Sequence, residues 1–234
     1  MDEADTINEE PRAIGNRPYT LSPKFKSLYE LLIEKNKVMN LTAITEEREV
    51  EALHFRDSLA VLEWIPEGAF SVVDVGTGAG FPGLPIAIAR PELRVTLLDA
   101  TEKKVEFLKD VAAQLDLANV TCVCARAEDY AKTARASFDF AVARALAKLN
   151  ALCELCMPLV KPGGAFIALK SAQTDEEIAD AARAIHTLGG ELEAVTDYTL
   201  PGTDIPRRAV VIRQKTAAPE QYPRGFAKIK KQPL

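Results

Sequence analysis

The stretch that decides the fold reads Val72-Val73-Asp74-Val75-Gly76-Thr77-Gly78-Ala79-Gly80-Phe81-Pro82-Gly83. A short apolar run rich in valine leads into a glycine-rich turn, and an apolar segment with helical character follows it. Glycines let the backbone of a turn approach a ligand closely, where a Cβ atom would collide with it. The stretch therefore predicts a strand, a ligand-binding turn and a helix, in that order.

The turn can be read in two registers. From Gly78 onward it matches G-x-G-x-x-G, the fingerprint of dinucleotide-binding proteins, and Asp99 lies 21 residues further on, where an acid that binds ribose is expected. From Asp74 onward it resembles the D/E-x-G-x-G-x-G turn of class I S-adenosylmethionine-dependent methyltransferases, with Gly76 and Gly78 in the turn. Asp74 would then face the cationic amino group of that cofactor, and Asp99 would accept hydrogen bonds from both ribose hydroxyls. The turn alone leaves a methyltransferase and an NAD-dependent oxidoreductase open.

Beyond residue 70, short apolar runs alternate with amphipathic ones, a pattern typical of a parallel sheet covered by helices. Strands are expected at 71–75, 94–98, 120–124, 138–143 and 164–169, and helices at 82–90, 102–116, 147–158 and 174–187. The last helix should open with a capping box of Thr174 and Glu177. Two further β-like runs, 190–199 and 207–213, leave no room for a helix between them, so they predict a hairpin and at least one antiparallel strand.

The N-terminal part has a different character. Ser22 and Pro23 are typical of a helix start, and apolar residues at helical spacing predict a helix over 23–38. Shorter helices are expected at 46–54 and 56–65. We therefore divide the chain into a disordered acidic lead-in at 1–20, a helical cap at 21–68, an α/β domain at 69–215 and a basic tail at 216–234.

Charge is distributed unevenly along the 234 residues. The net charge is −5, but the stretch 205–234 holds eight basic residues and a single acidic one, Glu220. A cationic end on an acidic body suits contact with the phosphates of a nucleic acid, and a solvated tail is the alternative. The candidate phosphate contacts are Lys103, Lys104, Arg207, Arg208, Arg224, Lys228, Lys230 and Lys231.

Several classes of protein are disfavoured. No apolar run approaches the roughly 18 residues that cross a bilayer. The first ten residues carry acids and no Lys or Arg, unlike a signal peptide, so we expect a cytoplasmic protein. The cysteines at 122, 124, 153 and 156 include one C-x-x-C pair but lack the glycine-rich knuckle of zinc ribbons, so free thiols and no metal are expected. A monomer is expected because no exposed apolar helix face stands out.

Further short segments, spread in order from about residue 25 to the C-terminus, together form a recognisable pattern. They are Asn36–Ile44, His54–Leu59, the glycine turn with Phe81-Pro82-Gly83, Ala143-Arg144-Ala145, Lys161–Gly164, Tyr222-Pro223-Arg224 and Lys230–Leu234. With these segments the chain resembles the bacterial RsmG family, also called glucose-inhibited division protein B, which methylates N7 of guanine in small-subunit ribosomal RNA. Two positions depart from the family pattern: Phe81 stands where leucine occurs in other members, and Ser171 where glycine is expected.

This resemblance implies a class I methyltransferase (Rossmann-like) α/β fold, with a mostly parallel seven-stranded sheet and an antiparallel edge hairpin. It implies methyl transfer from S-adenosylmethionine to 16S ribosomal RNA of the small ribosomal subunit. By family pattern the cofactor contacts are Gly76, Phe81, Asp99, Ala127, Glu128 and Arg144. Guanine N7 has a lone pair, so the reaction needs positioning rather than a general base, and Arg144 is the candidate that bridges cofactor and substrate. A non-catalytic RNA-binding assembly factor is a third alternative.

Overall fold

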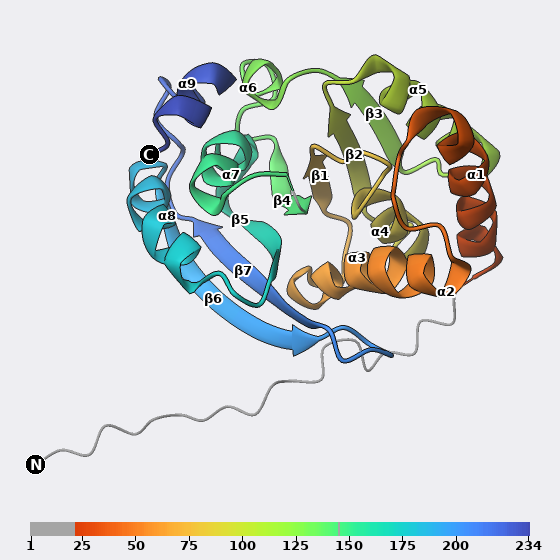
Figure 1. The fold of residues 1–234 in the computed structure, drawn as a ribbon. Coiled ribbons are helices and arrows are strands. Elements are labelled where there is room, and N and C mark those ends of the chain that lie inside the picture. Colours follow the sequence, from red (N-terminus) through yellow and green to blue (C-terminus); the bar gives the residue numbers. More distant parts are fainter. Residues whose placement is uncertain (1–21, 145) are drawn as a thin grey trace, which may run out of the picture.

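The computed structural model describes residues 22–144 and 146–234 (Figure 1). Within them the chain forms a seven-stranded sheet of order β3-β2-β1-β4-β5-β7-β6. The strands are β1 Ser71–Val75, β2 Arg94–Asp99, β3 Val120–Cys124, β4 Phe138–Arg144, β5 Val160–Ser171, β6 Gly190–Thr199 and β7 Pro206–Gln214. The pairs among β1 to β5 are parallel, whereas β7 runs antiparallel to both β5 and β6. The expected mostly parallel sheet with a hairpin at one edge is confirmed.

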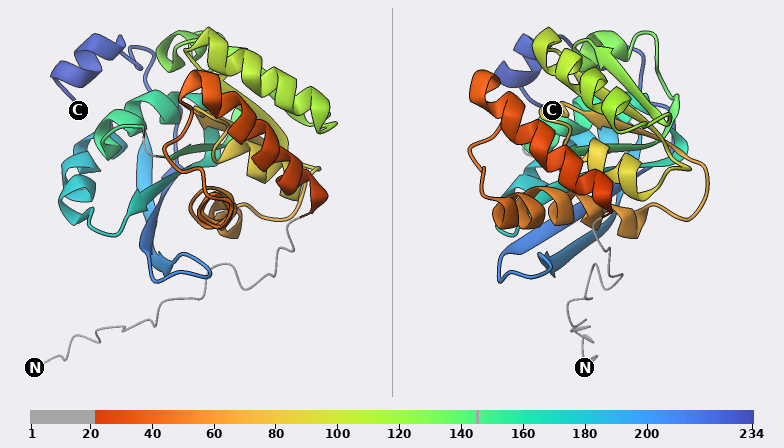
Figure 2. Two further views of the ribbon diagram at one scale, coloured as in Figure 1. Left: turned by 45° about the vertical axis from the view of Figure 1, so that its right-hand side comes forward. Right: turned by 90° about the vertical axis from the view of Figure 1, so that its right-hand side faces the viewer.

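Helices cover both faces of the sheet, which is why its central strands are apolar on both sides. The helices are α1 Pro23–Met39, α2 Glu47–Val50, α3 Asp57–Leu59, α4 Gly83–Ala89, α5 Glu102–Gln114, α6 Ala127–Tyr130, α7 Leu149–Cys156, α8 Asp175–Thr187 and α9 Phe226–Lys231. Alternate residues of one strand enter different cores: Val72 packs with α1, α4 and α5, whereas Val73 packs with α7 and α8. Figure 2 shows the sheet between these two groups of helices.

The helical cap differs in detail from its prediction. α1 begins at Pro23 as expected, but the Ser22 side chain makes no capping hydrogen bond, and the Ser22 carbonyl accepts one from the Phe25 N–H instead. Where two helices were predicted, the chain follows one unbroken helical path over residues 47–64, with a π-helical turn at Glu51–Arg56. No proline or glycine interrupts this stretch, so nothing in it forces a break.

The capping box predicted for α8 is wrong, although α8 begins where expected. Thr174 precedes the helix without a capping hydrogen bond. The carboxylate of Glu177 instead accepts hydrogen bonds from the Lys170 ammonium and from the Leu149 N–H, each at 2.5 Å. An ammonium and the N–H at the start of α7 attract this carboxylate more strongly than the first turn of its own helix does.

The segments on either side of the α/β part share its core. Leu28 and Leu32 of α1 are fully buried against Leu84 and Ile86 of α4 and their neighbours, and Ile229 of α9 is fully buried in the core beneath α7 and α8. The core thus crosses the expected boundaries at residues 68 and 215. The lead-in expected at 1–20 lies outside the described residues. None of the helices in the described part of the chain is long and apolar enough to cross a membrane.

Candidate active site

The carboxyl ends of β1, β2 and β3 enclose a first cavity of about 230 Å³. Four residues that the sequence predicted as cofactor contacts line it: Gly76, Asp99, Ala127 and Glu128. Gly76 directly follows β1, Asp99 ends β2, and Ala127 and Glu128 begin α6, which follows β3. Ligands of open α/β sheets bind at this edge, so the first cavity is the candidate cofactor site.

Asp99 is held in a fixed orientation at the first cavity. Its Oδ2 accepts a hydrogen bond from the Gly78 N–H at 3.0 Å, and its Oδ1 accepts one from the Thr101 N–H at 2.8 Å. The Lys104 ammonium lies 4.0 Å from Oδ2. Each carboxylate oxygen has further acceptor capacity, so this geometry leaves Asp99 able to bind a vicinal diol.

The free side of Gly76 faces Leu146. Gly76 has φ of +71°, and a Cβ added to it would lie 2.6 Å from Leu146 Cδ2. Leu146 also lines the first cavity. A side chain at residue 76 would therefore be strained by the backbone conformation and would intrude into the wall of the cavity.

Asp74 is hydrogen-bonded to both ends of the glycine turn. It is fully buried, and its Oδ2 accepts hydrogen bonds from the Thr77 hydroxyl at 2.5 Å and the Gly83 N–H at 2.8 Å. Burial raises the pKa of Asp74 to about 6, against the opposing effect of these hydrogen bonds. Asp74 does not line the first cavity, and its hydrogen bonds tie the glycine turn to the start of α4.

The same contact disfavours the dinucleotide register. In that register a pyrophosphate would bind at the N-terminus of α4, where Gly83 is the first helical residue. Here the Gly83 N–H is already bound by the Asp74 carboxylate. A buried carboxylate at that position would repel a pyrophosphate.

The glycine at position 83 is expected to be required for stability. A Cβ there would lie 2.2 Å from Leu97 Cδ2 and 2.9 Å from Asp74 Oδ2, both in the buried core. Gly83→Ala should therefore lower the free energy of unfolding by about 1–3 kcal/mol, measured by urea denaturation. Gly225→Ala is the control, because an added Cβ there meets nothing within 4 Å. Equal stability of the two variants would contradict the expectation.

A second cavity, of about 490 Å³, lies at the carboxyl ends of β4 and β5. Its lining residues are Ile44, Leu53, His54, Asp57, Arg144, Leu169, Lys170, Ser171, Glu177 and Arg207. The helical cap, the parallel strands, α8 and the edge hairpin all contribute to it. β4 pairs with β1, so the two cavities lie at the ends of neighbouring strands.

Arg144 is predicted as a cofactor contact, but the structure places it in the second cavity. Its Nη1 donates to the Leu53 carbonyl and to Asp57 Oδ2, both at 2.9 Å. The other oxygen of Asp57 accepts from Arg207 Nε at 3.2 Å and from the Tyr198 hydroxyl at 3.4 Å. One buried carboxylate therefore holds two guanidinium groups at the same cavity.

His54 is neutral near pH 7. Arg144 can only donate, so its Nη2, 3.3 Å from His54 Nδ1, makes Nδ1 the acceptor. The proton then lies on Nε2, which donates to the Thr42 hydroxyl at 2.8 Å. Burial and the nearby charge of Arg144 lower the pKa of His54 to about 4. The ring is a fixed element of the site and not a proton donor to a substrate.

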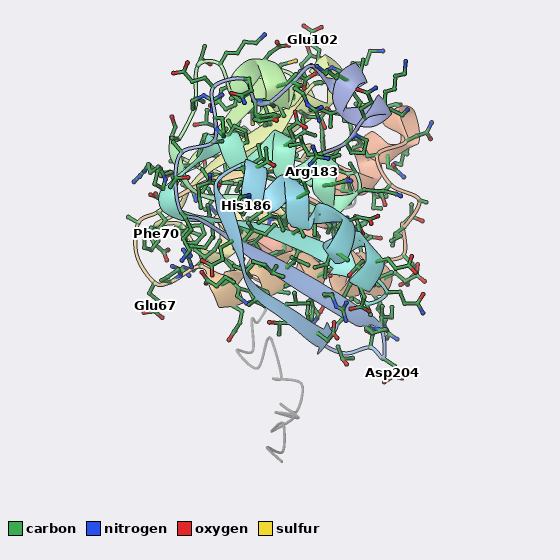
Figure 3. The ribbon with its side chains drawn as sticks, turned by 90° about the vertical axis from the view of Figure 1, so that its left-hand side faces the viewer. Glu67, Phe70, Glu102, Arg183, His186 and Asp204 are labelled. Atoms are coloured by element: carbon green, nitrogen blue, oxygen red, sulfur yellow. The ribbon has the colours of Figure 1, made fainter. Side chains whose placement is uncertain are left out.

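Phe81 packs against His54 and Arg144. Its ring stacks on His54, with centroids 4.7 Å apart, and the Arg144 guanidinium carbon lies 5.4 Å from its centre. Phe81 lines neither cavity. The other histidine, His186, lies on the exposed outer face of α8 near Arg183 (Figure 3).

The candidate phosphate contacts fall into three groups. Arg208 is held by Asp197 and Asp175, and Arg224 by Glu154, so both guanidinium groups are occupied inside the protein. Arg207 and Lys104 line the second and first cavities, respectively. The exposed ones are Lys103, Lys228, Lys230 and Lys231. Within residues 22–144 and 146–234, no three His, Cys, Asp or Glu side chains are placed to hold a metal ion.

Comparisons with known proteins agree with this geometry. The solved structures of TrmN from Thermus thermophilus and of TYW2 from P. horikoshii in complex with MeSAdo share the fold, with TM-scores of 0.53 and 0.56. They are 20% and 13% identical, and the matches cover 67% and 70% of this chain and 48% and 63% of theirs. The expected class I methyltransferase fold is thereby confirmed.

Similarity at the level of sequence is much higher. Two proteins named ribosomal RNA small subunit methyltransferase G, from Leuconostoc citreum and Pelotomaculum thermopropionicum, are each 44% identical to this chain. The matches cover 90% and 99% of this chain and 90% and 98% of those proteins. The family model described as rRNA small subunit methyltransferase G (GidB) matches residues 21–205. The chain therefore belongs to the rRNA small subunit methyltransferase G family.

Proposed function

We propose that this protein transfers a methyl group from S-adenosylmethionine to N7 of a guanine in 16S ribosomal RNA of the small ribosomal subunit, in the cytoplasm. Its relatives bear the name of a ribosomal RNA methyltransferase. The observation that carries the proposal is the pair of cavities at one sheet edge. The first presents the Asp99 carboxylate and the second presents the guanidinium groups of Arg144 and Arg207.

The residues of the first cavity fit S-adenosylmethionine. The bound cofactor supplies a methyl group on a positively charged sulfur. Asp99 is fixed by two backbone N–H groups and can accept hydrogen bonds from the ribose hydroxyls. Ala127 and Glu128 lie at the end of β3, where a backbone group and a side chain can meet the adenine. Gly76 supplies a wall without a side chain.

The second cavity fits a guanine and its phosphate. A guanidinium group can donate a hydrogen bond to O6 of a guanine or two hydrogen bonds to a phosphate, and Asp57 holds two such groups in place. N7 of a neutral guanine carries a free lone pair, so no general base has to remove a proton before the attack. The protein then acts by aligning N7 with the methyl group and by excluding water.

Contact with the RNA backbone is assigned to the exposed lysines. These are Lys103 on α5 and Lys228, Lys230 and Lys231 on α9, with Lys104 at the first cavity. We do not propose Arg208 and Arg224 as phosphate contacts, because each guanidinium group is already paired with a carboxylate of the protein. Arg207 remains a proposed contact, as a residue of the second cavity. Lysine contacts of this kind position the protein on RNA without reading sequence.

Calorimetric titration tests the identity of the cofactor. We expect the protein to bind S-adenosylmethionine and to give no binding signal with NADH. Asp99→Asn should weaken S-adenosylmethionine binding by about tenfold to a hundredfold, because it removes charged acceptors for the ribose hydroxyls. Asp110→Asn, which changes an exposed carboxylate on α5 outside the first cavity, is the control and should bind like wild type. Binding of NADH without a response to S-adenosylmethionine would refute the proposal.

A further inference from the structure

A phenylalanine from the C-terminal segment lines the first cavity. Phe226, the first residue of α9, shares this lining with Ala127 and Glu128 of α6. Its backbone N–H donates to Glu128 Oε1 at 3.3 Å, and the Arg126 guanidinium carbon lies 5.8 Å from the centre of its ring. Figure 1 shows α9 beside α6. The match to the family model ends at residue 205, before this segment.

The segment is anchored on both sides of Phe226. Before it, Arg224 forms two hydrogen bonds with the fully buried Glu154, from Nε at 2.7 Å and from Nη2 at 2.6 Å. After it, Ile229 is fully buried in the core. Further upstream, Arg135 donates hydrogen bonds to the carbonyls of Ala218 and Tyr222. The place of Phe226 at the cavity is therefore set by contacts on either side of it.

The ring itself is only partly buried. Phe226 is 38% exposed, whereas Ile229, one turn away on the same helix, is completely buried. An aromatic ring left open beside a cavity offers a flat apolar surface to a flat ligand group. Phe226 and Glu128 lie together, at the end of the cavity where the adenine is assigned.

We propose that Phe226 belongs to the binding site of the cofactor and contacts the adenine of S-adenosylmethionine. This inference rests on the proposed function, because the adenine is assigned from the methyltransferase cofactor. The chemistry is that of an aromatic ring against a nucleobase, which does not depend on hydrogen bonding. The C-terminal segment then contributes to the active site, in addition to the lysines that we propose as contacts of the RNA backbone.

The test is titration of the full-length protein with S-adenosylmethionine and, separately, with adenosine alone. Phe226→Ala should weaken the binding of both ligands by about tenfold, the effect of removing one aromatic contact to a base. Phe226→Trp, which keeps a flat ring, should stay within about twofold of wild type. The control is Leu192→Ala, because Leu192 on β6 is 40% exposed and lies outside the first cavity. It should bind both ligands like wild type.

Thermal unfolding without ligand separates binding from folding. Phe226→Ala and Leu192→Ala should unfold at similar temperatures. If Phe226→Ala does not fold, Phe226→Leu, which keeps most of the apolar volume and removes the ring, should still weaken adenosine several-fold. Two results would overturn this inference alone. One is wild-type affinity of Phe226→Ala for both ligands, and the other is a lower affinity for S-adenosylmethionine with an unchanged affinity for adenosine. A wild-type protein that binds no S-adenosylmethionine would instead refute the proposed function, and this inference with it.

Discussion

Replacing Arg144 by alanine is expected to slow methyl transfer by about a hundredfold to a thousandfold, the usual effect of losing a positioned donor at a reacting centre. The variant also leaves Asp57 with Arg207 as its remaining guanidinium partner and removes the donor to His54. Affinity for S-adenosylmethionine should change much less, because Arg144 lines the second cavity and not the first. Single-turnover rates and calorimetric binding measure the two effects separately.

Two further variants control this result. Arg144→Lys keeps the positive charge but lacks the planar group that binds Asp57 through one nitrogen and His54 through another, so it should recover only part of the rate. Arg183→Ala, on the exposed outer face of α8, should react like wild type. A wild-type rate of methyl transfer by Arg144→Ala would show that Arg144 has no role in the reaction.

Replacing Arg224 by alanine is expected to lower the free energy of unfolding by about 3–5 kcal/mol, because it leaves a buried carboxylate without its counter-charge. Glu154 is fully buried and accepts hydrogen bonds from the Arg224 backbone N–H, from its Nε and from its Nη2. The sequence predicted Arg224 as a phosphate contact, whereas the structure makes it the anchor of the C-terminal segment. Urea denaturation measures the loss.

A double variant distinguishes the lost ion pair from the lost packing of Arg224. Arg224→Ala combined with Glu154→Leu removes both charges, so it should recover much of the stability that Arg224→Ala loses. A loss below about 1 kcal/mol in the single variant would mean that water solvates Glu154 once the arginine is gone.

Local sequence patterns predicted the sheet and the first cavity well. Gly76 follows β1, Asp99 ends β2, and the Ala127-Glu128 pair begins α6 just after β3. Parallel strands bring their carboxyl ends to one edge of the sheet, so these residues meet there. The second cavity was harder to predict. Asp57 meets Arg144 and Arg207 across separations of 87 and 150 residues, which no local spacing reveals.

The number of basic residues at the C-terminal end was a poor guide to phosphate contacts for a related reason. Such a count treats every arginine of the basic end alike, but Arg208 is paired across the β6–β7 hairpin with Asp197 and Arg224 is paired with Glu154, 70 residues away. No local pattern in the basic tail predicted a role for Phe226, because its partner Glu128 lies 98 residues earlier in the chain. These contacts depend on the tertiary fold, and only the structure reveals them.

The central claim is methyl transfer to guanine N7, and it is tested most directly with small ribosomal subunits from bacteria that lack this family of enzymes. The subunits are incubated with the protein and S-adenosylmethionine labelled in the methyl group, and the RNA is then cleaved chemically at N7-methylguanine. We expect label at N7 of one guanine in 16S ribosomal RNA, and much slower labelling with Arg144→Ala. Label on another atom, or none from a protein that binds S-adenosylmethionine, would contradict the central claim.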